Sequence, residues 1–219
     1  QHLDGPKNQI CIAQPGAKTW VRSWVPNMET TGMVIRHGEA FTISDHLTVW
    51  DSNKAIYRPT VHYAYCPTDA AVASMHELEM RQWELTTNQR IMNEEIIDGD
   101  DRLGVLLMGH SYKSWWTGSL LNIHDSRKLI PKQSATTVQV ASAVYAAVAW
   151  AMANPNSGYK VPDDLPWQEV LGFAEKYWGG YHSAAADWDP LMHRNDLFKG
   201  WNNRQYDESD PWQFSNFLV

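Results

Sequence analysis

The sequence has only two cysteines in 219 residues, Cys11 and Cys66, and they lie far apart. Two such thiols form neither a disulfide framework nor a CxxC metal or redox motif, so we expect both to be ordinary buried cysteines. No hydrophobic run approaches the roughly 18 residues of a membrane span, and the first residues lack the pattern of a signal peptide. These absences predict a soluble, cytoplasmic protein without a membrane partner.

Positive charge is scarce as well. Eighteen Lys and Arg stand against 25 Asp and Glu, which gives a net charge of 18 − 25 = −7. This balance repels phosphate backbones and argues against a nucleic-acid partner. It suits the steering of small cations, although many proteins are acidic only to remain soluble. The 12 tryptophans leave two interpretations open, because indole faces bind ammonium groups but also fill cores.

Familiar cofactor and catalytic motifs are also missing. No GxGxxG follows a predicted strand and no GxxxxGK[ST] occurs, so this chain alone is not expected to bind a dinucleotide in the usual way. The zinc motif HExxH is absent, because Met80 stands where His76-Glu77 would require a second histidine. Ser111 lacks the second glycine of a GxSxG elbow. We therefore expect no metal ion and no serine nucleophile.

Hydrophobic alternation and turn residues predict the secondary structure. Strands are expected at 20–24, 33–37, 41–50, 55–65, 103–109 and 114–123. A helix beginning at Thr68 is expected to cross the sheet, and Ser134 or Thr136 is expected to cap a long Ala-rich helix ended by Asn154-Pro155. Small residues predict that this long helix is buried. Another helix should follow Pro166, and the chain after residue 181 shows no clear period.

These elements predict an α+β fold, with a mixed, mainly antiparallel sheet covered by helices. No internal repeat or low-complexity linker divides the chain. We therefore expect a single domain over residues 1–219.

Three local groups could carry chemistry. His37 and Glu39 are two residues apart, so in an extended chain they could hold an amine or move protons. The simpler alternative is a solvated strand end. Asp98-Gly99-Asp100-Asp101 concentrates negative charge that could bind a diamine or calcium, but it does not match an EF-hand and could equally be a solvated loop. His62-Tyr63-Ala64-Tyr65 fits a core or sheet-surface role.

Longer strings resemble the homospermidine synthases of the bacterial and viral type. Order and approximate spacing are kept from end to end, over about the C-terminal half of a family member. The strings include Val21-Arg22-Ser23-Trp24-Val25-Pro26, His37-Gly38-Glu39, Tyr57-Arg58-Pro59-Thr60-Val61-His62-Tyr63-Ala64-Tyr65, Ile97-Asp98-Gly99, Leu103-Gly104-Val105-Leu106-Leu107-Met108-Gly109-His110, Trp116-Thr117-Gly118-Ser119 and Asp210-Pro211-Trp212-Gln213-Phe214.

The resemblance implies an activity. In this family NAD oxidises putrescine to an imine, ammonia is lost, a second putrescine forms a Schiff base, and the same NADH reduces it to homospermidine. It further implies the C-terminal catalytic and dimerisation domain of a saccharopine-dehydrogenase-like enzyme. The N-terminal Rossmann domain, which would bind most of the NAD, is absent from this chain, so the chain alone should be inactive.

The resemblance also implies the site residues. His37 and Glu39 look like the family's His-x-Glu lining of the active site, and Asp101 looks like the carboxylate that anchors a distal ammonium. The expected partners are putrescine or another diamine, an N-terminal Rossmann-bearing half and a second copy in a homodimer. The alternative is a non-catalytic module that kept the fold for polyamine binding or oligomerisation.

Overall fold

The structure, a computed structural model, describes residues 16–194, 201 and 206–219. The chain forms two compact units. Unit 1 combines Gln1–Leu85, Met108–Ser114 and Asp187–Val219, and unit 2 combines Thr86–Leu107 and Trp115–Ala186.

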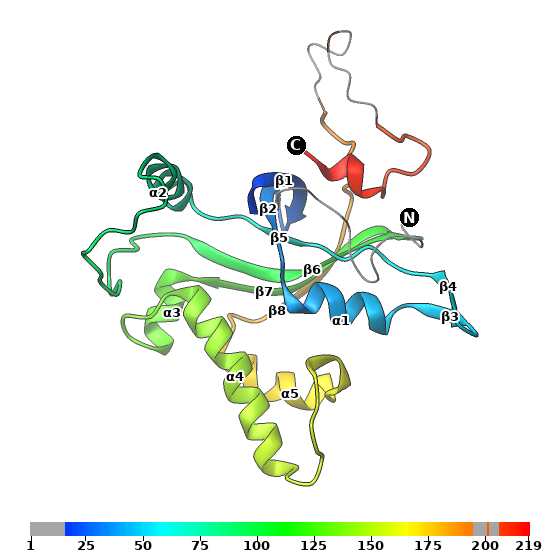
Figure 1. The fold of residues 1–219 in the computed structure, drawn as a ribbon. Helices are drawn as coiled ribbons and strands as arrows, with labels where there is room; N and C mark the ends of the chain where they lie inside the picture. The colour runs from blue at the N-terminus through cyan, green and yellow to red at the C-terminus, as the bar shows by residue number, and fades with distance from the viewer. Residues whose placement is uncertain (1–15, 195–200, 202–205) are drawn as a thin grey trace. The chain divides into compact units, whose positions relative to one another are not determined.

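Unit 1 is built on a three-stranded antiparallel sheet with the order β1-β2-β5 (Figure 1). The strands are β1 (Gly16–Val25), β2 (Met28–Ile35) and β5 (Tyr63–Tyr65). Val21, Met33 and Val34 are buried in it. Because Ile35 pairs with Tyr63, the end of β2 lies beside the start of β5.

The C-terminal segment of unit 1 packs against β1. Leu218 forms an isolated bridge with Val21, and the Val219 N–H donates to the carbonyl of Trp20 at 3.0 Å. The short helix η3 (Phe214–Phe217) buries its two phenylalanines, and the Phe217 ring lies beside Trp188. Residues far apart in sequence therefore share one core.

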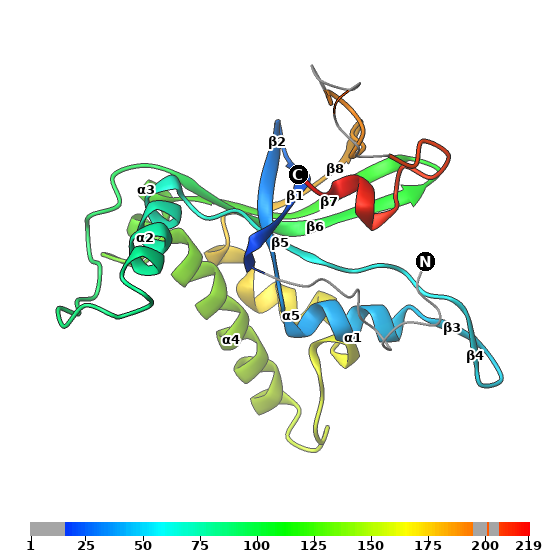
Figure 2. The same cartoon turned by 45° about the horizontal axis from the view of Figure 1, so that its top comes forward.

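The strand predicted over 41–50 is wrong for most of its length. Residues Gly38–His46 form helix α1, and only Val49–Asp51 form a strand, β3. Figure 2 shows β2 leading down into α1. Glu39 in the first turn and His46 in the last complement the helix dipole, and the buried Ser44 donates to the carbonyl of Pro59 at 3.2 Å. Alternation in the sequence could not reveal that contact.

The strand predicted over 55–65 is divided in two. Strand β4 (Lys54–Tyr57) pairs with β3 across the predicted turn, where Ser52 has φ 54°. The next strand is β5, and Pro59 lies in the interruption because proline cannot donate to a ladder. Helix α2 (Asp69–Met80) begins as predicted, with Thr68 Oγ1 accepting from the Ala71 N–H. None of its residues is buried, so it does not cover the sheet as expected.

Unit 2 contains most of a second sheet, with the order β6-β7-β8. Strands β6 (Asp100–His110) and β7 (Lys113–Asn122) match the two strands predicted there, and their short turn makes them an antiparallel hairpin. Strand β8 (Tyr181–Ala186) was not predicted, because its small residues carry little strand signal. Any Cβ on Gly104 would overlap the Trp116 ring, so that ring lies directly on the backbone of β6.

One face of this sheet is covered by helices of unit 2. They are α3 (Ile123–Leu129), α4 (Ala135–Ala153) and α5 (Trp167–Ala174), with short 3-10 turns at η1 (Pro162–Asp164) and η2 (Glu175–Tyr177). Leu121 of β7 packs with Ala135 and Val138 of α4. Helices α4 and α5 run side by side (Figure 1), and Trp150 Nε1 donates to Glu169 across them at 3.1 Å.

Helix α4 is capped by Ser134, as predicted, but its burial differs from the prediction. Six of its residues are buried, whereas Val140, Val144, Val148 and Met152 are 53–77% exposed. We call these four residues the α4 stripe. Helix α4 also has the length and hydropathy of a membrane span, a weak criterion that core helices meet as well. Helix α4 thus has one buried face and one exposed apolar face.

The predicted α+β class, with mainly antiparallel sheets and packed helices, is confirmed. The thiol prediction is wrong for Cys66, which is exposed and free. Cys11 lies outside the described residues.

Candidate functional site

His37 and Glu39 meet at the junction between β2 and α1. His37 is the extended N-cap residue of the helix, with φ −136° and ψ 143°, and Glu39 lies in the first turn. The Nδ1 atom of His37 contacts the Glu39 carboxylate, and both side chains stay partly exposed. The contact forms at a helix start, whereas the sequence led us to expect the two side chains along an extended strand. An exposed imidazole held by a carboxylate can bind an amine or transfer a proton.

Tyr63 supports this pair from the neighbouring strand. Its ring stacks on the His37 imidazole, with centroids 4.7 Å apart and planes 19° apart. The contact arises because Ile35, two residues before His37, pairs with Tyr63 in the sheet. Sequence reasoning assigned Tyr63 only a general sheet role and did not link it to His37. The stack limits rotation of the imidazole and so orients its second nitrogen.

The neighbouring His62 has a structural role. Its ring makes edge contacts with Phe214 and Phe217 at centroid distances of 5.3 and 5.4 Å. Burial lowers the pKa of His62 to about 4, so the imidazole is neutral near pH 7. This agrees with the core role expected for it.

Asp101 belongs to unit 2, whereas His37 and Glu39 belong to unit 1. It is the second residue of β6 and is half-buried. Two nearby acids have arginine partners: Glu95 pairs with Arg90 at 2.6 Å, and Asp100 pairs with Arg102 at 3.0 Å. Within the described part of the chain, no ion pair involves the Asp101 carboxylate.

Alternation along β6 places Asp101 on the open face of its sheet. Gly104, whose added Cβ would meet the Trp116 ring, belongs to the other face. Leu103, Val105 and Leu107 share the face of Asp101 and are 40–49% exposed. The carboxylate therefore stands at the end of an open apolar strip.

A second network in unit 1 serves the fold. Arg22 is buried, contacts Glu29 and donates to the carbonyls of Pro190 and Met192. Burial raises the pKa of Glu29, but hydrogen bonds from Arg22 and Trp188 outweigh it and hold the pKa below its usual value. These groups satisfy one another, so we assign them to anchoring the C-terminal segment.

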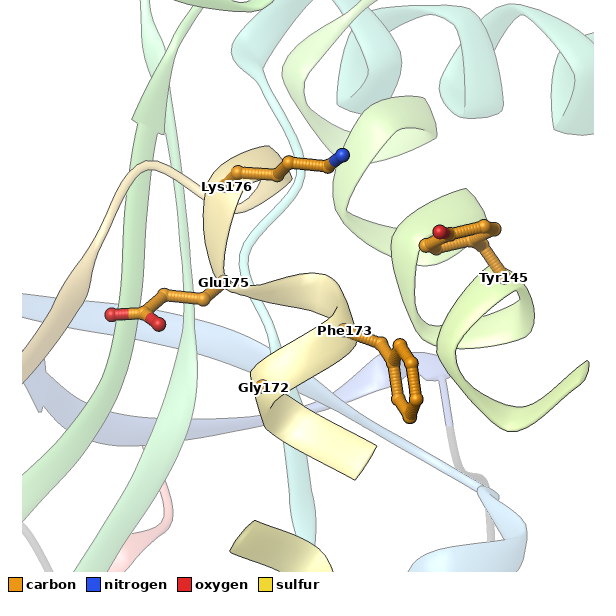
Figure 3. Close-up of a pocket in the computed structure, with 5 residues that line it drawn as sticks. All are labelled: Tyr145, Gly172, Phe173, Glu175 and Lys176. Atoms are coloured by element: carbon orange, nitrogen blue, oxygen red, sulfur yellow. The ribbon is translucent and has the colours of Figure 1, made fainter. Parts of the chain in front are cut away.

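A shallow hollow of about 440 Å³ lies between α4 and the end of α5 (Figure 3). Tyr145, Gly172, Phe173, Glu175 and Lys176 line it. Figure 3 shows the Lys176 ammonium extending toward α4, while the Glu175 carboxylate points away. A hydrogen bond with Tyr177 raises the pKa of Lys176, which keeps it charged. This hollow therefore does not suit a diamine, and none of the three predicted site residues lines it.

The described residues do not fit NAD by themselves. A dinucleotide pyrophosphate needs a helix start with free N–H groups and no competing negative charge. Helices α1, α2, α3 and α5 instead carry an acid in the first turn: Glu39, Asp69, Asp125 and Glu169. The start of α4 is occupied by its own Ser134 cap. Among the residues that the structure describes, no three His, Cys, Asp or Glu side chains lie close enough together to hold a metal ion.

Comparison with known proteins bears out the resemblance over the whole chain. The chain is 44% identical to the homospermidine synthase of Blastochloris viridis and 40% identical to that of Mesorhizobium japonicum, with all of this chain covered in both cases. It spans about 45% of the length of each of these curated relatives.

A solved structure agrees with these relatives. The homospermidine synthase of Legionella pneumophila, determined in complex with NAD, matches with a TM-score of 0.88 and 37% identity. The match covers 95% of this chain and 45% of that one. The family model described as saccharopine dehydrogenase C-terminal domain matches residues 1–177, most of the chain. The chain therefore belongs to the saccharopine dehydrogenase C-terminal domain family.

Proposed function

We propose that this chain is the C-terminal part of a homospermidine synthase, which converts two molecules of putrescine to homospermidine and ammonia with NAD. The observation that carries the proposal is the end-to-end similarity to two such enzymes, at 44% and 40% identity. In this proposal residues 1–219 act as one C-terminal catalytic domain. A further N-terminal part supplies the Rossmann fold, since the residues described here do not fit NAD.

His37 and Glu39 are the proposed groups for one amine of the substrate. The Glu39 carboxylate engages Nδ1 of His37, which leaves Nε2 as the nitrogen for a substrate amine. Stacking on Tyr63 supports this role, because it restricts the ring to one orientation.

Asp101 is the proposed anchor for a distal ammonium of the diamine. Its carboxylate has no cation partner among the described residues, although other acids of the same segment are paired. A carboxylate on an open apolar strip suits an ammonium carried by a methylene chain, because the strip can cover the methylenes.

We further propose that the complete enzyme is a cytoplasmic homodimer. The α4 stripe supports association, because an exposed apolar face without any charged residue in its helix suits another protein surface better than water. The same stripe favours the second candidate function, an oligomerisation or polyamine-binding module without catalysis. In that case the isolated chain should bind putrescine or itself without any added half.

A fusion experiment tests the proposed function. This chain is joined behind the N-terminal half of the Blastochloris viridis enzyme, and the product from putrescine and NAD is measured by mass spectrometry. Homospermidine formation is expected from the fusion and not from this chain alone. A folded fusion that binds NAD yet forms no homospermidine would overturn the proposal, and calorimetry with putrescine on the isolated chain then tests the binding module.

A further inference from the structure

Gln139 is a buried amide in the charge-free helix α4. Its side chain is 3% exposed. The Nε2 group donates to Ser119 Oγ of β7 at 2.8 Å and to the main-chain carbonyl of Asp101 of β6 at 3.5 Å. One amide nitrogen therefore connects α4 to β7 and to the start of β6.

Stability alone does not account for an amide at this position. The Oε1 atom of Gln139 is buried and has no partner among the described residues. A buried acceptor without a donor costs free energy, whereas a leucine of similar volume would fill the same space without that cost. The amide is therefore costly to the fold, and its two contacts suggest what it provides.

The start of β6 needs such support. Residues 86–99, which precede the strand, contain no helix or strand, and the strand begins at Asp100. The Ile123 N–H donates to the carbonyl of Gly99 at 3.0 Å and holds the chain just before the strand. Gln139 adds a contact from α4 to Asp101, the residue whose carboxylate is the proposed anchor.

We propose that Gln139 is a positioning residue that fixes Asp101 for the substrate ammonium. It acts through the Asp101 main chain and does not touch the substrate. The inference rests on the proposed function, which gives the Asp101 carboxylate its role. The attraction between a carboxylate and an ammonium depends on their separation. If the start of β6 shifts, the Asp101 carboxylate moves with it, and substrate binding weakens more than the rate of the chemical step.

The test uses the fused enzyme and the variant Gln139→Leu. We expect the KM for putrescine to rise about tenfold while kcat stays within about twofold, the pattern of lost substrate binding. The thermal midpoint should change little, because removal of the unpaired Oε1 offsets the loss of the two hydrogen bonds from Nε2. Ser142→Ala is the matched control: Ser142 is buried on the same helix, and its hydroxyl donates within the helix, to the Gln139 carbonyl at 2.7 Å. Its KM should not change.

A double-mutant cycle separates positioning from general damage. If Gln139 acts through Asp101, then Gln139→Leu should add nothing to the KM of Asp101→Asn. Two additive effects would overturn the inference. So would a fall in kcat and thermal midpoint together.

A readout without catalysis separates this inference from the proposed function. Amide hydrogen exchange at residues 100–102 of the fused protein should become faster in Gln139→Leu and stay unchanged in Ser142→Ala. A fusion that makes no homospermidine would refute the proposed function, whereas unchanged exchange at residues 100–102 would refute the positioning role even in an active enzyme.

Discussion

The side chain of Asn216 and the main chain of Asp207 exchange two hydrogen bonds. The Asp207 N–H donates to Asn216 Oδ1 at 2.9 Å, and Asn216 Nδ2 donates to the Asp207 carbonyl at 2.8 Å. Nδ2 also donates to the carbonyls of Asp210 and Pro211 at 3.1 and 3.3 Å. Asn216 is fully buried, so one carboxamide holds the loop that leads into η3.

Replacing this carboxamide should loosen the C-terminal segment. Asn216→Asp keeps the size of the side chain but places an oxygen against three carbonyls, so we expect the free energy of unfolding to fall by about 3 kcal/mol. Urea unfolding measures the change. The same substitution at exposed Asn93 should change stability by less than about 0.5 kcal/mol. Equal effects at both positions would contradict the proposed role of Asn216.

His62 should make the fold sensitive to acid. Burial lowers its pKa from 6.5 to about 4, so the unfolded chain takes up the proton at a higher pH than the folded chain. This contribution to stability is complete above about pH 6.5 and is lost as the pH falls toward 4, by about 3 kcal/mol in all.

Urea unfolding at pH 6.5 and pH 4.5 checks this prediction. His62→Leu should remove the His62 part of the difference between the two pH values, whereas His46→Leu, at an exposed position, should retain it. An unchanged pH dependence in His62→Leu would show that other groups cause the acid sensitivity.

Two adjacent glycines form a matched pair for a test of close packing. Both have left-handed backbones, with φ 84° at Gly179 and φ 98° at Gly180. A Cβ at Gly179 would overlap the carbonyl oxygen of Leu120, whereas a Cβ at Gly180 meets nothing within 4 Å. Gly180→Ala should cost about 1 kcal/mol from backbone strain, and Gly179→Ala should cost clearly more, about 3 kcal/mol or above. Thermal unfolding compares the stability of the two variants. Equal losses of stability would mean that the backbone at Gly179 can move away from Leu120 of β7 without cost, which would contradict the prediction.

The contact between His37 and Glu39 predicts a specific loss of activity. In the fused enzyme, Glu39→Gln removes the charge that holds the imidazole, and we expect kcat/KM for putrescine to fall about 100-fold. Glu77→Gln, at an exposed position on α2, is the control and should leave kcat/KM unchanged. If the Glu39→Gln enzyme kept the kcat/KM of the unchanged fusion, the contact between His37 and Glu39 would have a structural role only.

The sequence predicted those parts of the fold that depend on neighbouring residues. Thr68 and Ser134 are helix caps whose partners lie three residues away, so both helix starts were predicted correctly. The contact of His37 with Glu39 is local as well. Helix α1 was missed because Phe41 and Ile43 alternate as in a strand, while the Ser44 contact that favours the helix depends on Pro59.

Other features depend on distant partners and had no local signal. The stacking of Tyr63 on His37 follows from strand pairing, which periodicity does not specify. The face of α4 that would be buried could not be inferred, because a helix rich in alanine and valine is apolar all round. Gln139 was overlooked, although a polar residue between Val138 and Val140 was a visible signal.

The α4 stripe has a consequence for how the protein behaves in solution. Helix α4 contains no Lys, Arg, Asp or Glu, so its outer face carries no full charge near neutral pH that salt could screen. Any association through this face should therefore be nearly independent of ionic strength. It should weaken on cooling and strengthen on moderate warming, because burial of apolar surface is driven mainly by entropy near room temperature.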